Sequence, residues 1–196
     1  AVNAVVNLAP GAQPTRALFE WRRMTFNAGY TWTRIRSNAD GPWSVPQTGN
    51  IDDDWGPGPG DQPYRVQVLL TSTQLRDVTA SLTFSAGSGS VYTETTGYDD
   101  NGDGFVTDRR PGVGLRSLRG AGQAALNLRL QYALPLRAAT PGAQPRYRVN
   151  AFVSVQNVTN RQNLGGYSGV LTSPFYGQPT LAVGPRRVDI GMGMSF

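Results

Sequence analysis

The segment Val188-Asp189-Ile190-Gly191-Met192-Gly193-Met194-Ser195-Phe196 decides the fold of this chain. Apolar side chains occupy every second position of the segment, and small or polar residues fill the positions between them. Successive side chains of a β-strand point to opposite faces of a sheet. The pattern therefore predicts a strand that is apolar on one face only.

The same period of two recurs along the chain. Strands are expected within 1–8, 17–22, 25–33, 64–71, 78–96, 126–134 and 147–159, in addition to the carboxy-terminal segment. The runs 17–22 and 25–33 are separated by a short turn near Arg23, and we expect them to form a hairpin. The alternation is clearest around Leu128, where leucine occupies every second position.

Composition limits the fold class. The 24 glycines and 14 prolines interrupt the chain too often for long helices. The mean hydropathy is −0.34, and no run approaches the roughly 18 apolar residues of a spanning helix, which argues against a helical membrane protein. Strands of a membrane barrel dilute their apolar residues with polar ones, so they remain compatible with this hydropathy. The length of 196 residues predicts a single domain over 1–196.

The residue types argue against catalysis. The chain has no cysteine and no histidine, which removes disulfides, thiolate metal sites, the commonest general base and the commonest transition-metal ligand. Glu20 and Glu94 are the only glutamates, and neither belongs to a recognisable acid/base motif. We therefore expect no catalytic residues, no bound organic cofactor and no enzyme activity.

The net charge of +5 comes from 18 basic residues, all of them arginine. These arginines are scattered singly or in pairs and form no basic helix or stripe, which argues against nucleic-acid binding. Arginine inside a barrel wall, or arginine facing anionic lipid headgroups at the membrane rim, explains the same charge.

The connections between the expected strands differ in length in an ordered way. Those near Arg23, Gln74 and Thr140 are short, whereas those at 37–63, 97–122 and 160–185 are long. Counted back from Phe196, all the long connections fall on one side of the sheet. Outer-membrane barrels have short periplasmic turns and long extracellular loops, whereas a soluble β-sandwich has no reason to sort its loops in this way.

The predicted fold is therefore all-β: an antiparallel up-and-down transmembrane β-barrel, of which this chain forms a carboxy-terminal portion of about seven to eight strands. Aromatic residues near the expected strand ends are candidates for the two interfacial girdles, with ordinary core aromatics as the alternative. They are Tyr30, Trp32, Tyr64, Tyr132 and Tyr147.

One loop has the residue types of a metal site. Oxygen-bearing side chains at Asp99, Asn101 and Asp103, followed by a glycine, match the first half of a calcium loop. Arg110 stands where such a loop has its closing glutamate, so Asp108 is the candidate that closes the site. The full candidate set is Asp99, Asn101, Asp103, Phe105, Thr107 and Asp108. The alternative is an Asx-rich turn that satisfies its own backbone and needs no ion.

A second acidic stretch, Asp52-Asp53-Asp54, lies in the first long loop. Such a run could bind a cation or a cationic ligand. A charge run in an exposed loop is more often simply solvated, and we expect that here.

Several loop segments, in this order, resemble the end of TonB-dependent receptor-like proteins, in the branch that carries an amino-terminal carboxypeptidase-regulatory-like domain, the Oar-like receptors. They are Trp55-Gly56-Pro57-Gly58-Pro59-Gly60-Asp61, the stretches 95–104 and 108–114, and 167–177. The resemblance implies a bacterial outer-membrane barrel of about 22 strands with a plug, energised through TonB to import scarce ligands. The terminal pattern Val188, Ile190, Met192, Met194 and Phe196 also resembles the signal that the barrel assembly machinery reads.

The chain departs from that family in several respects. It holds only seven or eight expected strands, it has no plug or TonB-box segment, and it has Tyr64 where the family tends to carry histidine. We expect a carboxy-terminal piece of a larger barrel, with a small barrel that reuses this end as the alternative. The expected partners are outer-membrane lipid, the rest of the barrel or partner chains at the open sheet edges, the assembly machinery, and TonB through a plug outside this chain. The expected function is ligand uptake or binding, and the alternative is a scaffold or surface barrel that transports nothing.

Overall fold

The computed structural model describes residues 2–7, 23–42, 44–75, 77–136 and 147–195. Within this part of the chain the structure consists of strands, loops and one short 3₁₀ turn at Ile51–Asp54. No helix among these residues has the length and apolar character needed to cross a membrane. The strands are β1 (Val2–Asn7), β2 (Met24–Trp32), β3 (Arg36–Ser37), β4 (Gly56–Pro57), β5 (Tyr64–Ser72), β6 (Val78–Gly87), β7 (Val91–Tyr92), β8 (Leu118–Arg119), β9 (Gln123–Leu136), β10 (Tyr147–Gln156), β11 (Asn163–Tyr167), β12 (Pro179–Val183) and β13 (Arg187–Ser195).

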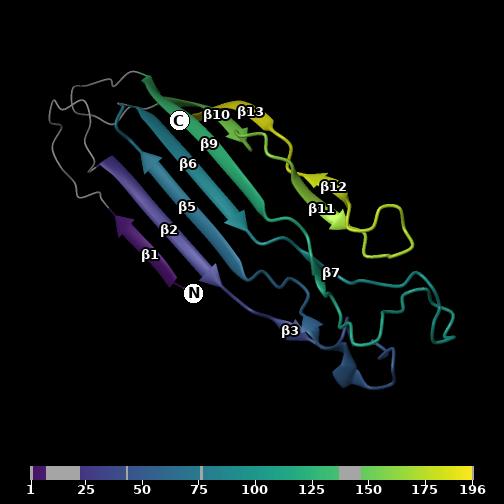
Figure 1. Cartoon of the computed structure of the whole chain (residues 1–196). Helices are drawn as coiled ribbons and strands as arrows, with labels where there is room; N and C mark the ends of the chain where they lie inside the picture. The colour runs from purple at the N-terminus through teal and green to yellow at the C-terminus, as the bar shows by residue number, and fades with distance from the viewer. Residues whose placement is uncertain (1, 8–22, 43, 76, 137–146, 196) are drawn as a thin grey trace.

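The long strands form one seven-stranded antiparallel sheet in the order β1-β2-β5-β6-β9-β10-β13 (Figure 1). Each long strand pairs with the next long strand along the chain, so the sheet is an up-and-down meander. This confirms the all-β antiparallel prediction. The sheet does not close on itself within the described residues, because β1 and β13 are its outer strands.

The register brings the apolar positions of the strands from β2 to β13 to one face. Leu82 of β6 lies opposite Leu70 on one side and Leu128 on the other, and Leu128 is in turn followed by Val155 and Val188 across β10 and β13. The neighbouring row, through Thr83 and Asn127, is polar except for Leu69 of β5. Since side chains alternate strictly, one face is apolar from β2 to β13 and the other is mainly polar.

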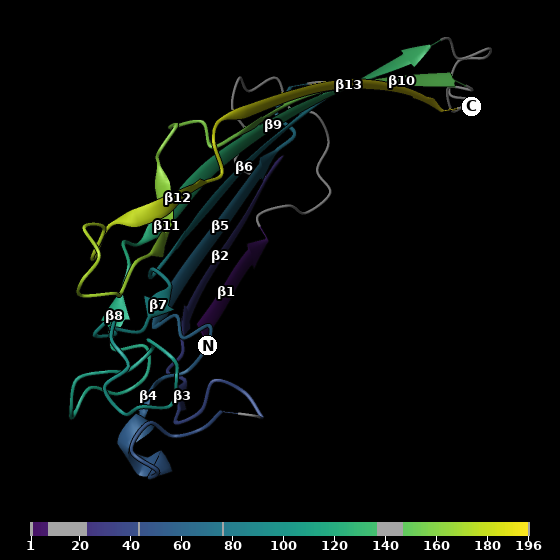
Figure 2. The same ribbon diagram turned by 90° about the vertical axis from the view of Figure 1, so that its right-hand side faces the viewer.

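Nothing in the described part of the chain covers the apolar face. Figure 2 shows the sheet as a single curved layer, with the loops gathered at one end. Ile190 and Met192 are each 79% exposed. The one buried hydrophobic side chain among the described residues is Leu115, 7% exposed, and it belongs to a loop and not to the sheet. The sheet therefore has no hydrophobic core of its own here.

The three long connections lie at one end of the sheet, as predicted. The turn between β5 and β6 is short, whereas the connections 33–63, 88–122 and 157–186 are long and all leave the same end of the sheet (Figure 1). Each long connection contains a small two-stranded sheet, namely β3–β4, β7–β8 and β11–β12. The turn expected near Thr140 lies outside the described residues, as does most of the stretch before Arg23 in which the other short turn was expected.

One detail of the strand prediction is wrong: β6 ends at Gly87 and does not run on to Thr96. The chain leaves the main sheet there, and Val91–Tyr92 form β7, which pairs with β8 in a separate two-stranded sheet. Of the expected hairpin, the segment 17–22 lies outside the described residues, and the two edges of β2 pair with β1 and β5.

An aromatic ring fills the space above a glycine on the polar face. Phe152 of β10 lies directly opposite Gly191 of β13, and a Cβ at Gly191 would lie 2.5 Å from two ring carbons. The Arg129 guanidinium lies 4.1 Å from the centroid of the same ring, close enough for a cation–π interaction. The glycine is therefore required by the ring, and not by backbone conformation.

We expect Gly191→Val to destabilise the folded protein by about 1–3 kcal/mol, because the added side chain displaces the Phe152 ring. Gly193→Val is the matched control, since no atom lies within 4 Å of a Cβ placed there. Urea titration of the detergent-solubilised protein, followed by tryptophan fluorescence, measures both variants. Equal losses at the two glycines would show that the ring contact does not matter.

Candidate functional site on the polar face of the sheet

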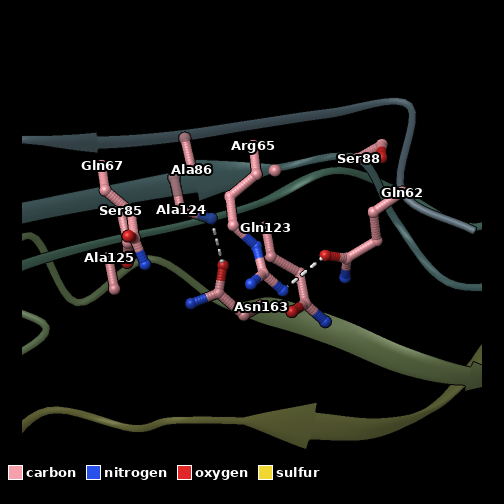
Figure 3. A pocket seen from close by; sticks show the side chains of 11 residues that line it. Gln62, Arg65, Gln67, Ser85, Ala86, Ser88, Gln123, Ala124, Ala125 and Asn163 are labelled. Atoms are coloured by element: carbon pink, nitrogen blue, oxygen red, sulfur yellow. Dashed lines mark hydrogen bonds between the residues drawn. The ribbon is translucent and has the colours of Figure 1, made fainter. Parts of the chain in front are cut away.

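A pocket of about 350 Å³ lies on the polar face, where β5, β6 and β9 reach the loops (Figure 3). Its floor is built from two neighbouring rows of the sheet: Arg65–Gly87–Gln123, and Gln67–Ser85–Ala125. Small residues occupy the centre of the first row and one end of the second, which leaves room between the longer polar side chains. The lining residues are Gln62, Arg65, Gln67, Ser85, Ala86, Gly87, Ser88, Gln123, Ala124, Ala125 and Asn163.

Two lining amides have their oxygens already bonded. The Asn163 Oδ1 accepts a hydrogen bond of 2.9 Å from the Ala124 backbone N–H, and the Gln62 Oε1 accepts one of 2.7 Å from Arg65 Nη2 (Figure 3). Each amide therefore has its NH₂ group left for another partner. Asn163 is only 7% exposed, so its position is fixed by the protein.

An ion pair with a buried carboxylate stabilises the loop side of the pocket. The Asp61 carboxylate pairs with the Arg119 guanidinium, and its other oxygen accepts a 2.8 Å hydrogen bond from the Ile35 N–H. Arg119 Nη1 also donates to the carbonyl oxygens of Asp61 and Gly89, at 2.8 and 2.9 Å. These bonds lock the first two long loops together beside Gln62, and so they position one wall of the pocket.

Further ion pairs continue this arrangement through the loops. Asp54 pairs with Arg109, and the two side chains are only 3% and 7% exposed. Arg116 pairs with Asp40 and also donates to loop carbonyls, while burial lowers the pKa of its guanidinium. The first two long loops thus have a polar interior in place of a hydrophobic one, and we call these joined loops the loop platform.

The buried pair corrects the prediction for the acidic run. Asp52 and Asp53 are exposed, as expected of a solvated run, but Asp54 is buried against Arg109. Its role in the described structure is to join two loops. The sequence spacing could not reveal this, because the arginine lies 55 positions away.

The third long loop joins the platform through Glu94. The Tyr176 hydroxyl donates a 2.7 Å hydrogen bond to Glu94 Oε2, and Arg110 Nε donates a 2.8 Å bond to Oε1. The Tyr176 hydrogen bond is the largest influence on the pKa of Glu94 and, together with Arg110, keeps it below the usual value although burial opposes the shift. The same bond raises the pKa of Tyr176.

We expect the junction of these loops to weaken in acid. Because the pKa of Glu94 is lower in the folded state than in the unfolded state, its contribution to stability is present above about pH 4.5 and is lost as the pH falls through the folded pKa. Hydrogen exchange of the Thr95 amide, which donates to Gly169 across the two loops, reports this loss. In Tyr176→Phe the protection should begin to fall at a higher pH than in the wild type, because the main cause of the lowered pKa is gone. The account of Glu94 is wrong if both proteins follow the same pH curve.

The predicted calcium loop folds around its own backbone. Asp99 Oδ1 accepts from the N–H groups of Gly102 and Asp103 at 2.8 and 3.0 Å, and Asp99 Oδ2 accepts from Gly104 at 3.0 Å. Asp108 Oδ2 accepts from two further backbone amides, at 2.6 and 3.0 Å. This is the geometry expected of the Asx-rich turn.

The other members of the proposed set give no additional ligand cluster. Phe105 is exposed at the loop tip, Thr107 lies beside it, and Asn101 bonds to Asp103. Across the described ranges, no group of three or more His, Cys, Asp or Glu side chains is placed to hold a metal ion. Calcium binding at this loop stays a prediction.

The residues of the proposed assembly signal share one face of the outer strand. Val188, Ile190, Met192 and Met194 all lie on the apolar face of β13, and Phe196 lies outside the described residues. Their recognition by assembly machinery stays a prediction.

Three of the candidate girdle aromatics lie together at the loop end of the apolar face, and their place in an interfacial girdle stays a prediction. Trp32 lies opposite Tyr64 on the apolar face, with Tyr30 one row below, and all three are exposed. Tyr132 lies towards the other end of the sheet, opposite Val78. The side chain of Tyr147 lies outside the described part.

Comparisons with known proteins do not place the chain in a family. No family model, no curated protein and no solved structure matched it.

Proposed function

We propose that this chain forms part of the wall of an outer-membrane β-barrel of TonB-dependent receptor type, and that the assembled protein binds a ligand and takes it up across the outer membrane. The observation that carries this proposal is the continuous apolar face that runs across the strands from β2 to β13, opposite a mainly polar face. Isolated hydrophobic residues are common on soluble proteins, but a contiguous apolar face of this extent marks a surface that meets another apolar phase.

The height of the apolar face supports a lipid environment. The apolar positions of β9 run from Ala124 to Leu134, about 33 Å along the strand. Barrel strands tilt by roughly 40°, which converts this length to about 25 Å along the membrane normal. An apolar band of about 25 Å is what outer-membrane barrels present to lipid.

The two open edges support a larger wall. β1 and β13 each have one edge without a strand partner among the described residues. Unpaired backbone groups are costly in hydrocarbon, so strands that span a membrane must belong to a closed barrel. Further strands of the same protein, or of partner chains, would fill these edges.

In this orientation the long loops face outward and the polar face lines the lumen. The pocket then opens to the lumen near the outer rim, where a ligand entering from outside meets it first. Trp32 and Tyr64 would lie at the outer lipid interface, where aromatic side chains are enriched. The β13 end would carry the residues read during barrel assembly.

A scaffold that transports nothing is the second candidate. The observation that favours it is the loop platform, because Asp54–Arg109 and Asp61–Arg119 fix the loops in one arrangement. Fixed surface loops suit a structural or adhesive role, whereas a transporter needs a pathway and an energy supply.

Intact-mass measurement of the native protein, extracted from outer membranes and combined with amino-terminal sequencing, distinguishes the two. We expect a protein well above 21.1 kDa with a plug domain upstream of this segment. An outer-membrane protein without a plug supports the scaffold. Recovery of the protein only from the soluble fraction contradicts both.

A further inference from the structure

We infer that the polar pocket binds a small oxyanion that also carries hydroxyl groups, such as a sugar acid or a sugar phosphate. Access of this solute to the pocket rests on the proposed function, because the polar face must line a water-filled passage. The chemistry of recognition comes from the lining residues themselves.

The pocket is rich in hydrogen-bond donors. Asn163 and Gln62 have their side-chain oxygens bonded within the protein, so each presents its NH₂ group. Arg65 uses one of its N–H groups on Gln62 and has further donors in a planar fork that matches carboxylate and phosphate oxygens. A ligand that supplies acceptors is therefore favoured over one that supplies donors.

The charge of the pocket also favours an anionic ligand. Its lining contains Arg65 and no aspartate or glutamate. On the same face of the sheet the described strands also carry Arg129, and Asp189 on that face is paired with Arg187. A polar surface with arginines beside the pocket raises the local concentration of anions.

The volume of the pocket and its uncharged polar side chains indicate the size of the ligand and its need for several oxygens. A volume of about 350 Å³ lies at the lower end of the range for small-molecule sites. Gln67, Gln123 and Ser85 add amide and hydroxyl groups around the arginine, which suits a ligand with several oxygens. A purely hydrocarbon anion would leave these groups without partners, at a cost in affinity.

One contact orients the Arg65 guanidinium. The exposed Arg65 side chain donates to Gln62, and the loop that carries Gln62 is held by the Asp61–Arg119 pair. Arg119 does not line the pocket and is a positioning residue.

Isothermal titration of the native protein in detergent tests the inference with three probes: gluconate, glucose 6-phosphate and glucose. The first two share the hydroxyl pattern of the third and add a carboxylate or a phosphate. We expect both anions to bind at least ten-fold more tightly than glucose, since hydrogen bonds to charged groups are the stronger kind. Gluconate binding without glucose 6-phosphate binding identifies a carboxylate site, and the reverse identifies a phosphate site.

Arg65→Gln should weaken anion binding about ten-fold or more and leave glucose binding unchanged. Arg129→Gln is the matched control, because Arg129 lies on the same face but outside the pocket and should keep wild-type affinity. Ala125→Phe, which fills the pocket without changing its charge, should abolish binding of all three probes.

The inference is overturned if glucose binds as tightly as gluconate, if Arg65→Gln binds both anions like the wild type, or if none of the probes binds. These outcomes are separate from failure of the proposed function. Titration in detergent requires only the folded protein, whereas the outer-membrane assignment is judged from where the native protein is found.

Discussion

Leu82→Arg is expected to prevent stable insertion of the protein into lipid vesicles, whereas Thr83→Arg inserts and folds like the wild type. Leu82 lies at the middle of β6, between Leu70 and Leu128 on the apolar face. β6 is itself the central strand of the seven. An arginine facing lipid at the bilayer midplane costs about 2–4 kcal/mol, while a lumen-facing arginine remains in water.

The two variants change neighbouring residues to the same side chain, so they differ only in the face that receives the charge. Folding into vesicles can be followed by protease protection and by the shift in gel mobility of a folded barrel. If Thr83→Arg fails and Leu82→Arg succeeds, the two faces have been assigned the wrong way round. If both succeed, neither face meets hydrocarbon.

Arg109→Ala is expected to destabilise the loop platform by about 3–5 kcal/mol, because it leaves the Asp54 carboxylate buried without a counter-charge. The Leu115 amide donates a 3.2 Å hydrogen bond to the Asp54 carbonyl, so hydrogen exchange at Leu115 reports the loss directly. The effect should be local, since the ion pair lies in the loops and the sheet register does not depend on it.

Arg187→Ala is the control for removing an arginine. Arg187 pairs with Asp189 at an exposed position, and such surface pairs contribute about 0–1 kcal/mol. Adding Asp54→Asn to Arg109→Ala should restore part of the lost protection, because the uncompensated charge is then removed. Equal effects of Arg109→Ala and Arg187→Ala would contradict a buried, interdependent pair.

Most of the sheet could be predicted because its signal is local. A period of two is fixed by backbone geometry, so alternation around Leu128 or Ile190 identifies a strand without knowledge of its neighbours. The pairing partner of a strand cannot be predicted from alternation. Alternation predicts β2 but does not show that its partners are β1 and β5, because pairing depends on contacts between strands that alternation does not contain.

The pocket could not be predicted from the sequence. Its floor forms only because the register sets Arg65 beside Gln123, with Gly87 between them, and this register depends on two connections of very different length. Its side wall comes from Asn163, which lies 39 positions from the Ala124 amide that it accepts from. The alternation predicts that the strand residues of the pocket lie on the polar face. It does not predict which residues of different strands become neighbours.

The predicted calcium loop shows that residue spacing fits two different structures. The spacing of Asp99, Asn101 and Asp103 suits calcium, yet the same oxygens at the same spacing also satisfy the N–H groups of their own turn. Residue spacing alone does not separate the two, because both arrangements need short polar side chains and a glycine that permits the turn.

Site-directed spin labelling tests the central claim most directly, and because these 196 residues contain no cysteine, a cysteine introduced among them is the one site of the segment that takes the label. In lipid vesicles, labels at positions 82 and 128 should be accessible to oxygen, which concentrates in hydrocarbon, and protected from a water-soluble nickel reagent. Labels at positions 83 and 131 should show the opposite preference. Low accessibility to both reagents at positions 82 and 128 would place the apolar face inside a protein core and contradict the membrane-wall account.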